Sequence, residues 1–185
     1  HEIVENERRL NREIPQRSKG EKRLFAYPFG EYNPELLSLL KQKGYYSIVQ
    51  QSGAVASPTQ DAIPRFPLAG NWAKRERLNT ALQSRPLPVI RVDAGATPEQ
   101  AASVLTLTIA PDFNLASIGC YTASGTKLAV NILGKNQIEI TLPHWTPGRQ
   151  KVNCTAPVGN EPGAYYWYSQ LWIIEEKKHV ANRGS

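Results

Sequence analysis

Hydrophobic residues follow two different periods in the two halves of this chain. After residue 100 they alternate with polar residues, which is the pattern of a strand with one buried face. Turns rich in Pro and Gly separate the alternating segments. The alternating positions are Leu105/Leu107/Ile109, Ala116/Ile118/Cys120, Leu128/Val130/Ile132, Ile138/Ile140/Leu142, Val152/Cys154 and Trp167/Ser169/Leu171/Ile173. With Val89–Val92 as a seventh segment, the pattern predicts an immunoglobulin-like β-sandwich over residues 89–180.

The first half instead combines helical spacing with short apolar runs. Residues 2–14 place Ile3, Leu10 and Ile14 on one side of a predicted amphipathic helix. Residues 24–50 predict a β-α-β unit. Its parts are a strand at 24–27, a helix at 34–43 and a strand at 45–50, followed by an extended segment at 63–66 and a third helix at 72–84 capped by Asn71.

The run from Leu24 to Asn33 is the most informative stretch of this half. Pro28 ends the predicted strand because proline has no N–H for a sheet ladder, and Gly30 allows the chain to reverse. Asn33 and Pro34 then form a helix start. Such a junction often only connects elements, but turns at the carboxyl ends of strands also carry functional groups in α/β folds.

Composition and charge support two domains. Residues 1–91 hold 15 Lys and Arg against 9 Asp and Glu, whereas residues 92–185 hold 7 of each. The segment Pro86-Leu87-Pro88 predicts a stiff linker, so we expect domains at 1–88 and 89–180 and a polar tail at 181–185. The basic charges of the first half are mixed with acidic ones, which favours a solvated helical face over nucleic-acid binding.

The chain has no methionine and no apolar run long enough to cross a bilayer. The missing initiator indicates the trimmed C-terminal part of a longer protein. Cys120 and Cys154 are the only cysteines, and they can be two buried thiols or one disulfide. We favour the disulfide, because a small domain of this kind gains most from one. A disulfide would in turn indicate the periplasm or the exterior of the cell.

An ordered series of motifs resembles the C-terminal part of the polysaccharide deacetylase family. The series covers residues 1–88 and consists of Tyr27-Pro28-Phe29-Gly30-Glu31-Tyr32-Asn33, Gly44-Tyr45-Tyr46, Gln51-Ser52-Gly53 and Ile63-Pro64-Arg65-Phe66-Pro67. The resemblance implies a partial distorted β/α barrel. It also implies metal-dependent removal of acetyl groups from a polysaccharide of the N-acetylhexosamine type, with a divalent metal, zinc being the expected ion.

The resemblance assigns roles to the turn that follows the first strand. The backbone N–H of Phe29 would donate to the oxyanion of the tetrahedral intermediate. Tyr27, Pro28, Phe29 and Gly30 would border the acetyl pocket, although core packing explains the two aromatic residues equally simply. Ala26 stands where the family usually has an arginine that orients a catalytic aspartate. We hypothesise that Arg65 supplies this guanidinium; a surface salt bridge is the rival interpretation.

The remaining catalytic parts are not found in this chain. The family's aspartates and metal-binding histidines would precede residue 1, in an upstream polypeptide that completes the barrel. His1, His144 and His179 have no ligand spacing and are expected at the surface. Trp72 falls in a predicted helix and is interpreted as packing, so the general acid is unassigned.

Aromatic residues are concentrated in the second domain, at 165–168, Trp172 and Trp145. Alternation places Tyr166, Tyr168 and Trp172 on one face of a strand, and Tyr165 and Trp167 on the other. One set belongs in the core. The outward set either stacks on sugar rings or braces the sandwich against the first domain, and bracing is favoured. Two rival functions therefore remain, a glycan-binding module without catalysis and a purely structural one.

Overall fold

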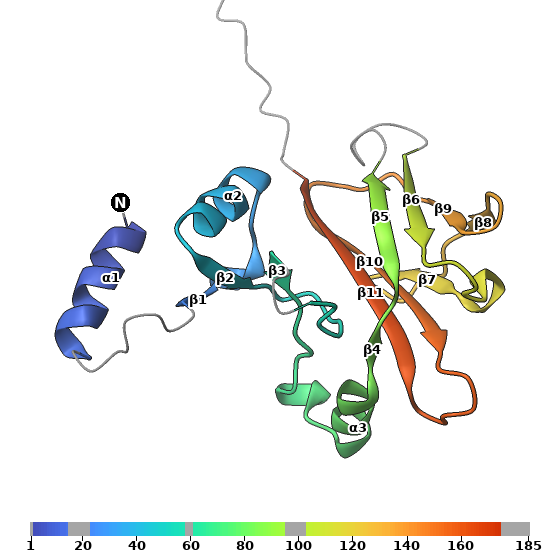
Figure 1. Cartoon of the computed structure of the whole chain (residues 1–185), viewed down its shortest axis with the longest axis horizontal. Coiled ribbons are helices and arrows are strands. Elements are labelled where there is room, and N and C mark those ends of the chain that lie inside the picture. Colours follow the sequence, from blue (N-terminus) through green and yellow to red (C-terminus); the bar gives the residue numbers. More distant parts are fainter. Residues whose placement is uncertain (1, 15–22, 58–60, 95–102, 175–185) are drawn as a thin grey trace, which may run out of the picture.

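The computed structural model describes residues 2–14, 23–57, 61–94 and 103–174. Within these residues the chain has three α-helices and three β-sheets, so the fold is mixed α and β with strands predominating (Figure 1). The helices lie in the first half of the chain, and both four-stranded sheets lie almost wholly in the second. The predicted tail at 181–185, His1 and His179 lie outside the described residues.

The first half of the chain forms a small parallel sheet. We call this sheet, together with two helices, the α/β region. Its elements are α1 (Glu2–Glu13), β1 (Arg23–Ala26), α2 (Pro34–Gln42), β2 (Tyr45–Ile48) and β3 (Ala62–Ile63), with sheet order β1-β2-β3. All three strands run parallel, as the predicted β-α-β unit requires. The Asn33 cap is also confirmed, since its Oδ1 accepts from the Leu36 N–H at 2.8 Å.

The predicted third helix and linker are partly wrong. Helix α3 begins at Arg75 and ends at Gln83, while Gly70–Trp72 forms a separate 3₁₀ turn that contains Asn71. Lys74, not Asn71, precedes the first helical turn. The Pro-rich segment is not a free linker: Arg85–Pro86 forms strand β4, and Leu87 is buried.

The linker prediction failed because proline can occupy the end of a sheet where its missing N–H is not needed. Strand β4 runs parallel to β11, with Pro86 opposite Trp167. The next residue resumes normal hydrogen bonding, since the Leu87 N–H donates to the Trp167 carbonyl at 3.1 Å. The division of the chain into domains at residue 88 stays a prediction.

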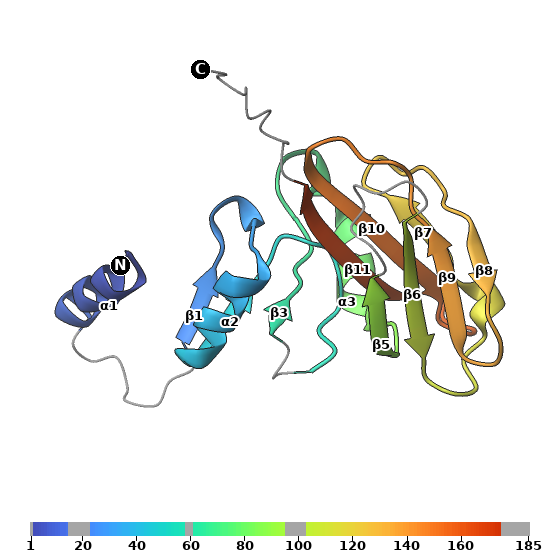
Figure 2. The same ribbon diagram turned by 90° about the horizontal axis from the view of Figure 1, so that it is seen from above.

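Two four-stranded sheets pack face to face in the second half, with orders β4-β11-β10-β7 and β5-β6-β9-β8 (Figure 2). We call this the two-sheet region. Its strands are β5 (Val89–Ala94), β6 (Val104–Ile109), β7 (Gly119–Thr122), β8 (Val130–Ile132), β9 (Gln137–Thr141), β10 (Gly148–Pro157) and β11 (Tyr165–Ile174). All seven alternating segments thus contain strand, although the one at 116–120 begins as a 3₁₀ turn, Leu115–Ser117.

The alternating residues of the two sheets meet in one hydrophobic cluster. Leu105, Leu107 and Ile109 of β6 are fully buried against Ile138 and Ile140 of β9. Tyr166, Tyr168 and Trp172 of β11 also pack on this cluster, so of the two predicted faces of this strand theirs is the core face.

The predicted disulfide is confirmed. Cys120 of β7 and Cys154 of β10 are direct cross-strand partners, and their sulfurs are bonded. The bond therefore joins two neighbouring strands of one sheet. It closes a loop with a sequence separation of 34 residues, which restricts the unfolded chain.

The outer face and edge of β11 carry the α/β region. Gln51 Nε2 donates to the Ser169 carbonyl at 3.3 Å, and the Ser169 hydroxyl donates to the Ser52 carbonyl. Trp167 meets Phe66 edge to face, with 5.1 Å between ring centroids. Outward-facing Trp167 is therefore a brace between the two regions, the alternative that the sequence favoured.

Candidate functional site

The carboxyl ends of β1, β2 and β3 meet at one edge of the parallel sheet, because parallel strands all end on the same side. The residues that follow them include Phe29 after β1, Gln50 after β2 and Arg65 after β3. The sequence predicted two of these, Phe29 and Arg65, as site residues. The structure brings both to this edge.

The turn after β1 has an unusual backbone. Phe29 has φ 55° and ψ 3°, in the left-handed region that residues other than glycine rarely occupy. Its side chain is nevertheless 81% exposed, so burial of the ring does not compensate for the strain. Strain of about 1 kcal/mol at a non-glycine residue is characteristic of functional turns. The backbone of Phe29, rather than its ring, is the feature that the fold maintains.

Gly30 holds this turn against the next strand. It is buried and has φ 71°. A Cβ atom at this position would lie 2.4 Å from the Cβ of Gln50, a distance that real Cβ atoms do not show. Glycine is therefore needed both for the backbone angle and for the close approach of Gln50.

Gln50 connects the turn to Arg65. With its amide nitrogen toward the turn, Gln50 donates to the Phe29 carbonyl at 3.2 Å and its oxygen accepts from Arg65 Nη2 at 3.0 Å. The Arg65 backbone is fixed as well, since its N–H donates to the Gln51 carbonyl at 3.0 Å. The guanidinium group predicted to serve this site therefore lies one side chain away from the strained turn.

A second guanidinium group reaches the same place from the two-sheet region. Arg149, near the start of β10, donates from Nη1 to the Phe29 carbonyl at 3.1 Å. Sequence reasoning missed this residue because 120 positions separate it from Phe29. The one local signal beside Arg149 in the sequence is Gly148, which indicates a turn and not a site. The edge thus holds two guanidinium groups beside a backbone carbonyl that already accepts hydrogen bonds. This arrangement suits the binding of a carboxylate or an oxyanion.

Tyr27 is part of the core of the α/β region. It is only 2% exposed, its hydroxyl donates to Ser47 Oγ at 3.1 Å, and its ring stacks on Tyr32 with 5.0 Å between centroids. Burial raises the pKa of the Tyr27 hydroxyl, and the Ser47 hydrogen bond partly opposes this. Core packing explains this residue, whereas Pro28 starts the 3₁₀ turn. The acetyl-pocket roles of Tyr27, Pro28, Phe29 and Gly30 stay predictions.

The described residues do not fit a metal ion by themselves, since they contain no group of three or more His, Cys, Asp or Glu that could hold one. His144 is exposed at the surface of the two-sheet region. Trp72 lies in the 3₁₀ turn and not in a helix, and it is 57% exposed, although its ring packs on the Arg77 guanidinium. The described residues also contain no helix long and apolar enough to span a membrane.

Comparisons with protein-family models, curated proteins and solved structures gave no match to this chain. The function is therefore argued from the geometry of the edge and from the motifs it contains.

Proposed function

We propose that this chain is the C-terminal part of a metal-dependent polysaccharide deacetylase, followed by an immunoglobulin-like β-sandwich. The observation that carries the proposal is the link from the strained Phe29 turn through Gln50 to Arg65 at the carboxyl edge of the parallel sheet. The motif resemblance gives Phe29 a role in the site, and our hypothesis from the sequence adds Arg65 to it. Their meeting in space supports that reading independently of the motif.

In this proposal the Phe29 turn supplies the oxyanion donor. Phe29 and Gly30 both have positive φ, and two turn hydrogen bonds, from Gly30 N–H to the Tyr27 carbonyl and from Glu31 N–H to the Pro28 carbonyl, fix the backbone around the Phe29 N–H. A preorganised N–H needs no reorganisation when negative charge develops on the acetyl oxygen. The strain in the turn is the cost of this preorganisation.

Arg65 and Arg149 have a positioning role in the same proposal. Ala26, at the end of β1, cannot orient a catalytic aspartate, but two guanidinium groups lie beside the next turn. Either can hold a carboxylate in a fixed direction and keep it ionised as a base. Arg149 thus gives the second region a role in the site of the first.

The metal and its ligands belong, in this proposal, to an upstream polypeptide that completes the barrel. The open side of the α/β region supports such a partner: β1 is an edge strand with Leu24 60% exposed, and Val4 of α1 is 62% exposed. Apolar side chains on an edge strand are normally covered. The confirmed disulfide supports a periplasmic or secreted location, where a polysaccharide substrate would be met.

A structural module is the second candidate. The Phe66–Trp167 contact favours it, because Trp167 packs between the two regions as a structural brace would.

Acetate release from N-acetylglucosamine oligomers with added zinc distinguishes the two candidates. The chain extended upstream by about one domain length should release acetate, and this chain alone should not. Absence of release from both proteins, with the folded state of each verified, would favour the structural or glycan-binding candidates.

A further inference from the structure

A separate cavity lies between α3 with its preceding turn and the outer face of the sheet β4-β11-β10-β7. Its volume is about 510 Å³, within the range of small-molecule sites. Trp72, Arg77 and Thr80 line it from the helical side, and strands β7, β10 and β11 line it from the other. None of Phe29, Gln50, Arg65 and Arg149 lines this cavity, so it is distinct from the carboxyl edge.

Two cations face the cavity without a carboxylate partner. Neither Arg77 nor Lys151 forms an ion pair within the part of the chain that the structure describes, and no acidic residue lines the cavity. Burial lowers the pKa of the Lys151 ammonium, and repulsion from Arg149 and Arg77 lowers it further. A bound anion would relieve that repulsion and the cost of burial together.

Arg77 is held in place by aromatic rings rather than by hydrogen bonds. Its guanidinium carbon lies 5.2 Å from the ring centroid of Trp72, 5.3 Å from that of Phe66 and 5.7 Å from that of Trp167. Its Nη2 donates to Ser52 Oγ over a long distance of 3.4 Å. Its Nε is buried and has no hydrogen-bond partner among the described residues. A buried N–H of a cation without an acceptor is costly.

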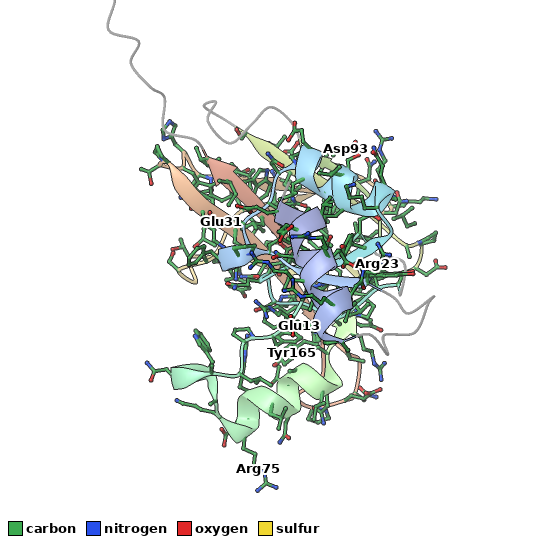
Figure 3. The ribbon with its side chains drawn as sticks, turned by 90° about the vertical axis from the view of Figure 1, so that its left-hand side faces the viewer. Glu13, Arg23, Glu31, Arg75, Asp93 and Tyr165 are labelled. Carbon is green, nitrogen blue, oxygen red and sulfur yellow. A yellow bond between two sulfur atoms is a disulfide. The ribbon has the colours of Figure 1, made fainter. Side chains whose placement is uncertain are left out.

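The rest of the lining suits a ligand with many hydroxyl groups. Short neutral donors and acceptors surround the two cations: Thr80, Thr122, Asn153, Thr155 and Ser52. Tyr121, Tyr165, Trp72 and Trp167 supply flat apolar surface. Figure 3 shows Tyr165 on the side of the sheet toward α3, whereas Arg75 extends from that helix away from the rest of the molecule.

We propose that this cavity binds an acidic sugar, a hexuronate residue of a carboxylated polysaccharide. The carboxylate lies between Arg77 and Lys151, the ring hydroxyls meet the threonine and asparagine side chains, and the ring face rests on the aromatic wall. The proposal does not rest on deacetylase chemistry, and a protein without that activity would bind in the same way.

Binding can be followed at the four tryptophan indoles of the full chain. Trp72 and Trp167 line the cavity, while Trp145 and Trp172 contact each other beside the core cluster. In a ¹H–¹⁵N spectrum, trigalacturonate or a glucuronate trimer should shift the indole signals of Trp72 and Trp167 only. Their neutral counterparts, galactotriose and cellotriose, should bind at least about tenfold more weakly, the effect of losing one charge-assisted contact.

Charge-neutral variants locate the binding site. Lys151→Gln should weaken uronate binding about tenfold, and Arg77→Gln by at least as much. Lys135→Gln, in the β8–β9 turn, and Arg75→Gln, on α3, remove the same charges away from the cavity and should leave binding unchanged. Thermal unfolding of each variant verifies that it is folded, and Lys151→Gln serves as the test if Arg77→Gln does not fold.

Absence of binding by both uronates at 0.1 M salt or below would overturn the proposal. Equal binding of the neutral trimers, or equal weakening by the Lys135→Gln and Lys151→Gln variants, would also overturn it. Tighter binding of adenosine monophosphate than of either uronate would also overturn it, in favour of a nucleotide site.

Discussion

The two regions of this molecule differ in the size of their buried hydrophobic clusters. In the two-sheet region fifteen buried residues form one cluster, and this cluster includes both cysteines of the disulfide. The corresponding cluster of the α/β region has three buried residues, Tyr27, Leu40 and Val49. The α/β region also exposes many large apolar side chains, among them Leu24, Phe29 and Leu39. One region resembles a complete domain and the other resembles part of one.

The strained turn of the proposed site therefore lies in the region with the smaller core. Strain such as that of Phe29 persists only where surrounding structure holds it, and a three-residue cluster offers little support. The support comes from the two-sheet region, through Arg149 on the Phe29 carbonyl and Trp167 on Phe66. We infer that the two-sheet region serves as the scaffold for the α/β region.

We expect the largest effect from truncating a core leucine in each region. Leu107→Ala should cost about 4 kcal/mol of global unfolding free energy, because its well-packed surroundings cannot collapse. Leu40→Ala should instead reduce hydrogen-exchange protection in α2 and β2 and leave the two-sheet region unchanged. Denaturant titration with exchange mass spectrometry measures both. Equal global losses would show that the regions unfold as one unit.

Removing the disulfide probes the two-sheet region alone. A Cys120→Ala, Cys154→Ala double variant should lose about 3–4 kcal/mol, from the closed loop of 34 residues. Calorimetry should show a lower Tm for the two-sheet transition. An unchanged transition would mean that the disulfide does not constrain the unfolded chain.

The brace between the regions can be measured by a double-mutant cycle. Phe66→Ala and Trp167→Ala should each destabilise the attachment of the α/β region, with a coupling energy of about 1 kcal/mol for the edge-to-face pair. Phe113→Ala with Trp167→Ala is the control, since Phe113 contacts Tyr166 in the core instead. Zero coupling for the first pair would separate the two regions energetically.

The smallest effect is a loss of stability in alkaline solution. Burial raises the pKa of the Tyr168, Tyr32 and Tyr27 hydroxyls above the ordinary value of 10.0. Their stabilising contribution is therefore complete below pH 10 and falls as the pH rises above it, because the unfolded chain loses these protons first.

The variants Tyr168→Phe and Tyr27→Phe assign this loss to one region each. Tyr168→Phe should make the global stability less dependent on pH above 10, and Tyr27→Phe should do so only for exchange protection in the α/β region. A pH dependence unaffected by either variant would exclude the buried tyrosines as its cause.

The sequence predicted the elements with strong periodicity and missed the contacts made across the chain. Strands β6 and β9 and the Asn33 cap followed from local patterns, because side-chain alternation and capping depend on neighbouring residues. The disulfide was favoured from the small size of the domain. The prediction of a linker at Pro86 was wrong, because this segment pairs with β11 as a strand. Arg149 and the orientation of Gln50 depend on tertiary contacts that no local pattern encodes.

The proposal that the carboxyl edge of the parallel sheet is catalytic can be tested by comparing two arginine variants. Acetate release should be measured for the upstream-extended chain carrying either Arg65→Ala or Arg23→Ala, which removes an arginine from the opposite edge of the same sheet. We expect Arg65→Ala to lower kcat about 10- to 100-fold with little change in KM, because it misplaces the catalytic carboxylate, and we expect Arg23→Ala to have no such effect. Unchanged acetate release by the Arg65→Ala protein would contradict the proposal.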